Sequence, residues 1–390
     1  MGYALNLNPN DSACNKPTRP AKKPQCSDGP SVRYPDHSFD DSACRSWNLE
    51  DPILTQRSSM QDVADLAGVS VATVSRALRD SSLVAESTRD RVLAAAEEFS
   101  FSISRAASSL ATGRLERIAV LVSGRLSSWF NGSVLDAIYE QLRAARHELI
   151  IYRIIDEGQH AEFFATLPAR RNADALIVAS FALTAADHQR LRNLSLPLIY
   201  LNQRVRGAAS VSIDDLQAAR TGTRHLIQLG HRRIGFATTL QRSGLTHSAA
   251  DRVHGYRAEL AAAKITADPK QIFAAASDAD GEAIVAALLS RPSPPTALVV
   301  ASDELALSVL AALGRAGLYA PGDISVLGFD DHAMAERFGL TTIAQPVTEL
   351  GRTAATMALK LAAKTPLQPK TITLPTRLVL RHTTARPSKR

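Results

Sequence analysis

The chain has 390 residues, 45% of them hydrophobic, and a formal net charge of +7. This length allows two or three domains with sizeable cores, and the lack of an unbroken apolar run of membrane-spanning length excludes an integral membrane protein. The N-terminus lacks a charged region followed by an apolar one, so we expect a cytoplasmic protein rather than a secreted one. Cys14, Cys26 and Cys44 show no metal-ligand spacing, so no metal or cofactor is expected.

Residues 1–57 are rich in Pro, Asn, Ser and Asp and show no sustained periodicity. This composition predicts a disordered extension, and it indicates no function. The positive net charge would suit nucleic acid, but between Ser58 and Arg117 seven arginines accompany eight acidic residues. Bulk charge therefore does not identify a nucleic-acid partner; only its placement on a docking surface can.

Two short helical patterns follow, separated by a three-residue turn that begins at Gly68. Ser59 and Asp62 have the spacing of a capping box for the first helix. Gly68 can adopt the left-handed conformation that ends a helix, and Ser70 is a good cap for the next one. Two helices joined this tightly indicate a helix-turn-helix unit.

The second helix, residues 71–78, is predicted to bury Val74, Ala77 and Leu78. Small apolar side chains on its outer face can contact thymine methyl groups, an arginine can reach a guanine edge, and hydroxyls suit phosphate oxygens. A surface hairpin with a solvated arginine would show the same spacing, so the pattern alone leaves both interpretations open. The outward side chains are Val71, Ala72, Thr73, Ser75 and Arg76.

The string DVADLAGVSVATVSRAL, from Asp62 to Leu78, resembles the DNA-binding head of the lactose-repressor (LacI/GalR) family of bacterial regulators. The resemblance implies a DNA-binding head over residues 58–103, with Ser59 and Ser70 among its DNA-contacting residues. A third helix, residues 87–99, is expected to begin at a cap formed by Ser87 and Asp90. Its predicted inner face consists of Val92, Leu93, Ala96 and Phe99.

Residues 104–115 contain RAASSLATGR, which is similar to the family's hinge segment. The segment is short and polar, so we expect it to be helical only when two copies pack together on DNA. Leu110 would then be an apolar wedge in the minor groove, and Ala107 would contact DNA beside it. An ordinary interdomain linker is the alternative.

From residue 116 to residue 390, apolar strands alternate with amphipathic helices. This order predicts an α/β fold of parallel sheets covered on both faces, and the length favours two lobes with a cleft at the carboxyl ends of the strands. The predicted strands span 118–122, 148–152, 175–178, 198–200, 234–236, 297–300 and 324–327; the predicted helices include 133–146, 216–229, 251–263, 281–289 and 304–317.

The resemblance continues through this region. It includes SDELA at residues 302–306, VLGFDD at 326–331 and LTTIAQP at 340–346. It implies a periplasmic-binding-protein-like effector domain, in which the chain crosses between the lobes three times. It also implies an effector, most simply a sugar or sugar derivative, bound in the cleft between them.

The resemblance assigns a role to each expected effector-site residue. An arginine would clamp the polar groups of the ligand, a carboxylate would accept from its hydroxyls, and an aromatic ring would stack on it. A surface ion pair, a turn cap and plain core packing are the respective alternatives. The residues concerned are Trp129, Phe130, Asn202, Arg252, Ser302 and Asp330.

No phosphate-binding loop, nucleophile elbow or zinc-binding helix motif is present, so no catalytic residue is predicted. His225 and His231 are expected to organise a turn rather than bind a metal. We therefore expect a transcription regulator, specifically a repressor, that binds operator DNA as a homodimer, with a tetramer left open. The alternatives are a solute-binding receptor and, with less support, a sugar-metabolising enzyme.

Overall fold

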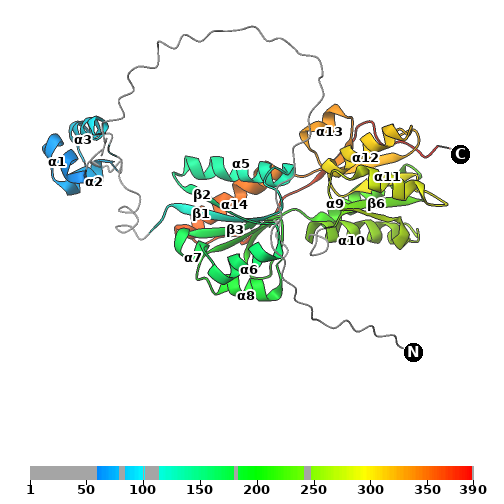
Figure 1. Cartoon of the computed structure of the whole chain (residues 1–390), viewed down its shortest axis with the longest axis horizontal. Coiled ribbons are helices and arrows are strands. Elements are labelled where there is room, and N and C mark those ends of the chain that lie inside the picture. Colours follow the sequence, from blue (N-terminus) through cyan, green and yellow to red (C-terminus); the bar gives the residue numbers. More distant parts are fainter. Residues whose placement is uncertain are drawn as a thin grey trace, which may run out of the picture. The chain divides into compact units, whose positions relative to one another are not determined.

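The computed structural model describes residues 59–78, 84–99, 101, 114–179, 183–240 and 247–388. The predicted extension and most of the predicted hinge, with Ala107 and Leu110, lie outside these ranges. Figure 1 shows a small helical head and a core built on two sheets. Within these ranges no helix is long and apolar enough to cross a membrane.

The head consists of three helices, α1 (Met60–Ala67), α2 (Val71–Leu78) and α3 (Glu86–Glu98), packed around one small core. The predicted capping box is confirmed, because the Ser59 hydroxyl accepts from the Asp62 backbone while the Asp62 carboxylate accepts from the Ser59 backbone. Gly68 ends α1 at φ +64°, and the Ser70 hydroxyl accepts from the Thr73 N–H at 3.1 Å. Val74 and Ala77 of α2 are buried as predicted.

The prediction for α3 was wrong in two respects. The helix begins after Ala85, which makes no side-chain capping bond, so the expected cap by Ser87 and Asp90 is absent. The buried face is Val92, Ala95 and Ala96, whereas Leu93 is 47% exposed and Phe99 is 36% exposed. The buried residues have i, i+3, i+4 spacing and therefore lie on one face of the helix. Two of the three are alanines, so small side chains, rather than the largest apolar ones, pack against α1 and α2.

Lobe 1 is built on a parallel six-stranded sheet of order β11-β5-β4-β3-β1-β2. One face packs against α5 and α14, and the other against α6, α7 and α8. Its strands are β1 (Arg117–Ser123), β2 (Glu148–Ile154), β3 (Ala175–Ala179), β4 (Leu198–Leu201), β5 (Ala209–Ser212) and β11 (Thr371–Thr373); its helices are α5 (Trp129–Ala144), α6 (Glu157–Thr166), α7 (Ala169–Asn172), α8 (Ala185–Arg192) and α14 (Val347–Ala362).

Lobe 2 is built on a second six-stranded sheet of order β12-β10-β9-β8-β6-β7, parallel except for β12. Helices α9 and α10 cover one face, and α11 and α12 cover the other. Its strands are β6 (Ile234–Thr239), β7 (Ile272–Ala275), β8 (Ala297–Val300), β9 (Ser325–Asp330), β10 (Thr341–Ala344) and β12 (Arg377–Val379); its helices are α9 (Asp215–Gln228), α10 (His247–Ala262), the 3₁₀ turn η2 (Pro269–Gln271), α11 (Gly281–Leu289), α12 (Asp303–Arg315) and α13 (Ala333–Arg337).

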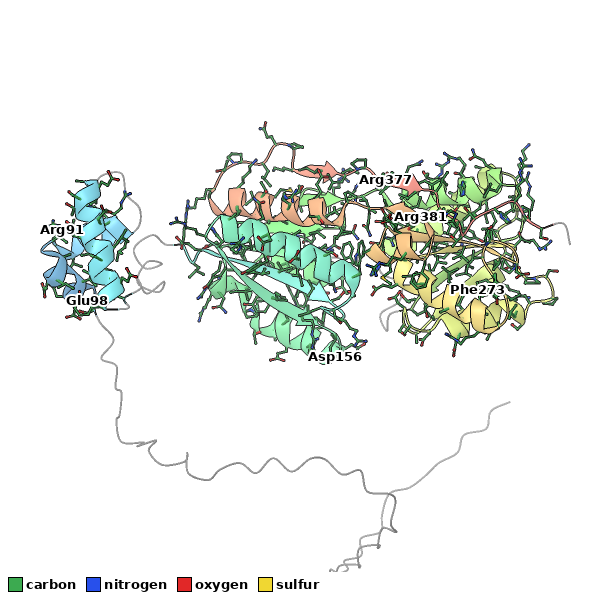
Figure 2. All side chains as sticks on the ribbon, turned by 90° about the horizontal axis from the view of Figure 1, so that it is seen from above. Arg91, Glu98, Asp156, Phe273, Arg377 and Arg381 are labelled. Atoms are coloured by element: carbon green, nitrogen blue, oxygen red, sulfur yellow. The ribbon has the colours of Figure 1, made fainter. Side chains whose placement is uncertain are left out.

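The chain crosses between the lobes three times, as predicted. It passes from β5 to α9, returns from β10 to α14, and crosses again from β11 to β12. Figure 2 shows Arg377 and Arg381 along this last segment. Because residues from both lobes contribute to one continuous apolar cluster, the crossings form a shared junction rather than a loose linker.

Each predicted strand is present, but α5 begins one turn earlier than expected, at Trp129. Trp129 and Phe130 are therefore the first residues of a helix and not part of a loop after β1. The two histidines were expected to organise a turn, but the contacts of their rings include the distant C-terminal segment: His231 Nε2 lies 2.8 Å from the Ala385 carbonyl, and His225 Nε2 lies 3.0 Å from Thr384 Oγ1. Burial lowers the pKa of both imidazoles, and they anchor the C-terminal segment to lobe 2.

Candidate DNA-binding face and effector site

The outer face of α2 carries the residues that the sequence assigned to DNA. Val71, Ala72 and Arg76 are exposed, and Thr73 and Ser75 are half-buried. The opposite face packs into the head core, which fixes the direction of these side chains. A short helix with small side chains at its start and one arginine a turn later has the shape and chemistry to enter a major groove.

The two serines assigned to DNA also stabilise the helices that present this face. Ser59 caps α1, and its hydroxyl donates to Asp62 at 2.8 Å. These bonds lower the pKa of the Asp62 carboxyl. Ser70 and Thr73 place their hydroxyl oxygens 2.9 Å apart at the exposed start of α2. Such hydroxyls can still accept or donate to a phosphate oxygen while they cap a helix.

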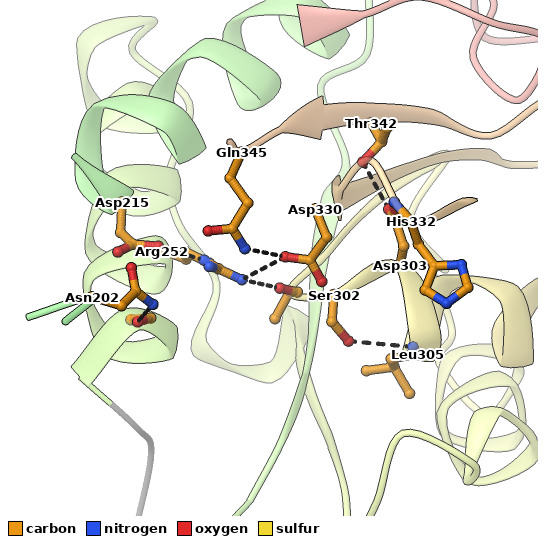
Figure 3. Close-up of polar contacts among 12 residues, drawn as sticks. Asn202, Asp215, Arg252, Ser302, Asp303, Leu305, Asp330, His332, Thr342 and Gln345 are labelled. Atoms are coloured by element: carbon orange, nitrogen blue, oxygen red, sulfur yellow. Dashed lines mark hydrogen bonds and ion pairs between the residues drawn. The ribbon is translucent and has the colours of Figure 1, made fainter. Parts of the chain in front are cut away.

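The centre of the candidate effector site is Arg252 of α10 (Figure 3). This residue is only 7% exposed. Its Nε donates to Asp215 Oδ1 at 2.8 Å, and its Nη1 donates to the Ala301 carbonyl. The guanidinium also lies over the Phe329 ring, 3.5 Å from its centroid, and 3.9 Å from Asp330 Oδ1. Arg252 and Asp330 are therefore brought together, as the sequence predicted.

Close packing of two helices sets this geometry. Gly255 lies on α10, where a Cβ atom would stand 2.2 Å from the Leu216 carbonyl of α9. Only glycine therefore allows the two helices to approach this closely. The approach brings Arg252, one turn before Gly255, against Asp215 at the start of α9.

Two buried carboxyl groups lie beside the Arg252 guanidinium. Burial raises the pKa of the Asp215 carboxyl, and the adjacent Arg252 opposes that shift. Burial also raises the pKa of Asp330 well above its ordinary value; Arg252 opposes this shift and the neighbouring Asp303 reinforces it. A buried arginine of this kind is held by its partners and does not present a free positive charge to a ligand.

Buried acceptors without a partner lie beside this group. The Gln345 side chain donates from Nε2 to Asp330 Oδ1 at 2.6 Å, but its Oε1 has no hydrogen-bond partner among the described residues. Asn202 donates from Nδ2 to Ser248 Oγ at 3.1 Å, and its Oδ1 is likewise unpartnered. Each residue is less than a tenth exposed. Because an unpaired buried acceptor is costly, these oxygens are suited to a ligand that donates hydrogen bonds.

The remaining predicted residues are more widely spread. Asn202 and Asp215 line a pocket of about 280 Å³, whereas Trp129 and Gln345 line another of about 620 Å³. Phe130 packs at the edge of the apolar core. The Ser302 hydroxyl caps α12 by accepting from Leu305 N–H at 3.3 Å, and it donates to Asp278 at 2.7 Å.

Sequence reasoning missed three residues of this site: Asp215, Gln345 and Asp303. Two of them belong to strings that were recognised, since Gln345 ends TTIAQ and Asp303 follows Ser302 in SDELA. Asp215 directly follows the first crossing after β5, at the carboxyl end of a strand. That position was a usable signal, because ligands of open α/β sheets bind at such ends.

The comparisons with known proteins agree with this architecture. Residues 59–103 match the family described as bacterial regulatory proteins, lacI family, and residues 223–384 match a periplasmic binding protein-like domain. The chain is 32% identical to the HTH-type transcriptional regulator GalR of Salmonella typhimurium strain LT2 over 335 residues, which are 85% of this chain and 97% of the relative.

Two solved structures extend the likeness to three dimensions. A Lac repressor dimer bound to operator and an anti-inducer is 27% identical with a TM-score of 0.74, and covers 85% of this chain and 100% of its own. A complex of the transcriptional regulator CelR with cellobiose is 26% identical with a TM-score of 0.62, and covers 84% and 100% respectively.

A helix-turn-helix head joined to a two-lobed core defines a DNA-binding transcription regulator rather than an enzyme, and the matched relatives are themselves regulators. The chain belongs to the LacI family of bacterial transcription regulators.

The buried position of Arg252 leads to a stability prediction. Arg252→Ala would remove the hydrogen-bonded counter-charge of the buried Asp215 carboxylate, so we expect the free energy of unfolding to fall by about 3–5 kcal/mol. Adding Asp215→Asn should recover part of that loss, because the amide needs no counter-charge. Denaturant unfolding of both variants measures the effect. Equal stability of wild-type and Arg252→Ala proteins would show that the ion pair contributes nothing to the fold.

Proposed function

We propose that this regulator is a repressor that binds a near-palindromic operator as a homodimer, under the control of a small, uncharged, hydroxyl-rich ligand, most simply a sugar. The observation that carries the ligand part is the pair of buried, unpartnered acceptors beside Arg252, on Asn202 and Gln345. A tetramer remains compatible with the proposal.

The DNA-binding part rests on the exposed face of α2 and on similarity to a dimeric repressor seen on its operator. Arg76 would read a guanine edge, and small side chains at the start of α2 would contact thymine methyls. Ser59, Ser70, Thr73 and Ser75 would contact phosphates, and the predicted hinge residues Ala107 and Leu110 would act in the minor groove between the half-sites.

Exposed apolar residues at the outer edge of lobe 1 support the proposal of a homodimer. Strand β2 is the edge strand of its sheet, and it carries the exposed apolar residue Ile151, which is 40% accessible. Tyr139, on the adjoining helix α5, is 49% accessible. An apolar side chain on an unpaired sheet edge is the kind of surface that a second copy of the chain can cover.

The charge balance of the site supports an uncharged ligand. Arg252 already faces Asp215 and Asp330, and among the described residues that line the smaller pocket Asp214 and Asp251 accompany one cation, Arg204. A phosphate or carboxylate group in the smaller pocket would lie among more acidic than basic described residues, which opposes binding. A neutral sugar instead donates several hydroxyl protons, which match the two unpartnered oxygens.

Arg76→Ala tests the DNA-binding face. Loss of a bidentate guanine contact should weaken specific operator binding by about 1–3 kcal/mol and relax sequence preference at one position, with the unfolding temperature unchanged because Arg76 is exposed. Selection of binding sites from random DNA measures both effects. Identical preferences for the variant and the wild type would remove Arg76 from the readout.

Asn202→Gly tests the effector site. Asn202 has φ 57°, which glycine tolerates, so the fold should persist while one ligand acceptor disappears. We expect sugar affinity to fall by about 1–3 kcal/mol, with operator affinity in the absence of sugar unchanged. Operator titrations across a panel of neutral sugars measure the response.

Ser195→Gly is the matched control, because Ser195 is also left-handed, at φ 54°, but lies on the surface. Wild-type sugar response in the Asn202→Gly protein would exclude Asn202 from the site. A phosphorylated or acidic sugar that acts more strongly than its neutral counterpart would overturn the proposed ligand class.

A further inference from the structure

The backbone is unusual where β9 ends and leads into α13. Asp330 and Asp331 are consecutive non-glycine residues with positive φ, at 128° and 62°. Side chains rarely adopt this conformation, so a turn containing two of them persists only where its surroundings hold it. We refer to residues 330–332 as the Asp turn.

The two ends of the Asp turn contact different parts of the molecule. At its start, Asp330 meets Arg252 and accepts from Gln345 in the candidate effector site. At its end, the His332 ring packs against Trp129 of lobe 1, with ring centroids 5.5 Å apart. Between them, Asp331 pairs with Arg381 at 2.7 Å. One short turn of lobe 2 therefore faces both the ligand site and the opposite lobe.

Asp303 stabilises the Asp turn by hydrogen bonding. It is the first residue of α12 and is completely buried. Its Oδ2 accepts from the His332 backbone N–H at 2.8 Å, and its Oδ1 accepts from Thr342 Oγ1 of β10 at 2.7 Å (Figure 3). The carboxylate thus joins α12, β10 and the Asp turn.

The residues packed around Asp303 leave space for its carboxylate. Gly328 lies on β9 beneath it, and a Cβ atom there would stand 2.1 Å from Asp303 Oδ1. Burial raises the pKa of the Asp303 carboxyl to about 6. An apolar residue at this position would avoid the free-energy cost of burying a carboxylate. It could not, however, accept a hydrogen bond from the backbone of the turn.

We propose that Asp303 is a positioning residue, which fixes the Asp turn so that Asp330 stays against Arg252 while His332 stays against Trp129. A displacement of Asp330 by a ligand would then move His332 and change the contact between the lobes. This last step rests on the proposed effector function; the positioning role itself does not, because it concerns contacts between residues of the protein.

Tryptophan fluorescence of the full-length protein tests the positioning role. The chain has two tryptophans, so a Trp47→Phe background leaves Trp129 as the sole reporter. His332→Ala in that background defines the emission of Trp129 without its ring partner. We expect Asp303→Ala to shift the emission to longer wavelength, toward that reference, because the His332 N–H loses its acceptor.

Two matched variants separate positioning from general stability. Thr342→Val breaks the other hydrogen bond to the same carboxylate, so it should lower the unfolding temperature while keeping wild-type emission. Asp303→Asn retains an oxygen that can accept from the turn, and it should restore wild-type emission. If Asp303→Ala does not fold, Asp303→Ser, whose hydroxyl is too short to span the same distance, should give the shift.

The positioning role is overturned if the alanine or serine variant keeps wild-type emission, or if Thr342→Val shifts it equally. A separate operator titration with neutral sugars keeps the two proposals distinguishable. If the emission behaves as expected but no sugar alters operator binding, the effector function fails and the role of Asp303 stands.

Discussion

The core of this regulator depends on a buried guanidinium whose charge must be compensated within the protein. Arg252 joins α10 to the start of α9 through Asp215, to the end of β8 through a carbonyl, and to the end of β9 through Asp330. Because leaving any of these charges unpaired is costly, the elements that carry them are held in one arrangement at the carboxyl edge of the lobe 2 sheet. The candidate ligand site consists of the other polar groups at this edge of the sheet.

The same edge is where the two lobes meet. The crossing from β5 to α9 ends at Asp215, and the crossing from β10 to α14 begins at Gln345. A ligand that bonds to Asn202 and Gln345 would therefore bridge lobe 1 and the crossing segments. Binding energy of this kind can favour one arrangement of the lobes over another, and a coupling of about 1–3 kcal/mol is typical of allosteric proteins.

Sequence analysis predicted most of the fold because its signals were local. The capping box at Ser59, the glycine that ends α1 and the near-continuous apolar strands each act within a few residues. Strands β11 and β12 have three residues each, too few to show a period, and they exist because other strands offer them an edge. The inner face of α3 was mispredicted because alanines, and not the larger Leu93, pack against the other two helices of the head.

The site was predicted only in part, for a related reason. Arg252 and Asp330 were found through recognised strings, but their partner Asp215 lies 37 residues from Arg252 and is brought to it by helix packing. The roles of Asp303 and Gln345 likewise depend on side-chain contacts between separate elements, which one sequence does not reveal. Trp129 was placed near the site, whereas its observed partner, His332, could not be anticipated from either string.

We propose that the unpartnered acceptors beside Arg252 receive an uncharged, hydroxyl-rich ligand. A crystal structure of the protein with a bound neutral sugar tests it most directly. We expect ligand hydroxyls to lie within hydrogen-bond distance of Asn202 Oδ1 and of Gln345 Oε1. The Arg252–Asp215 ion pair should remain intact. A sugar bound elsewhere, with both oxygens still unpartnered, would contradict it.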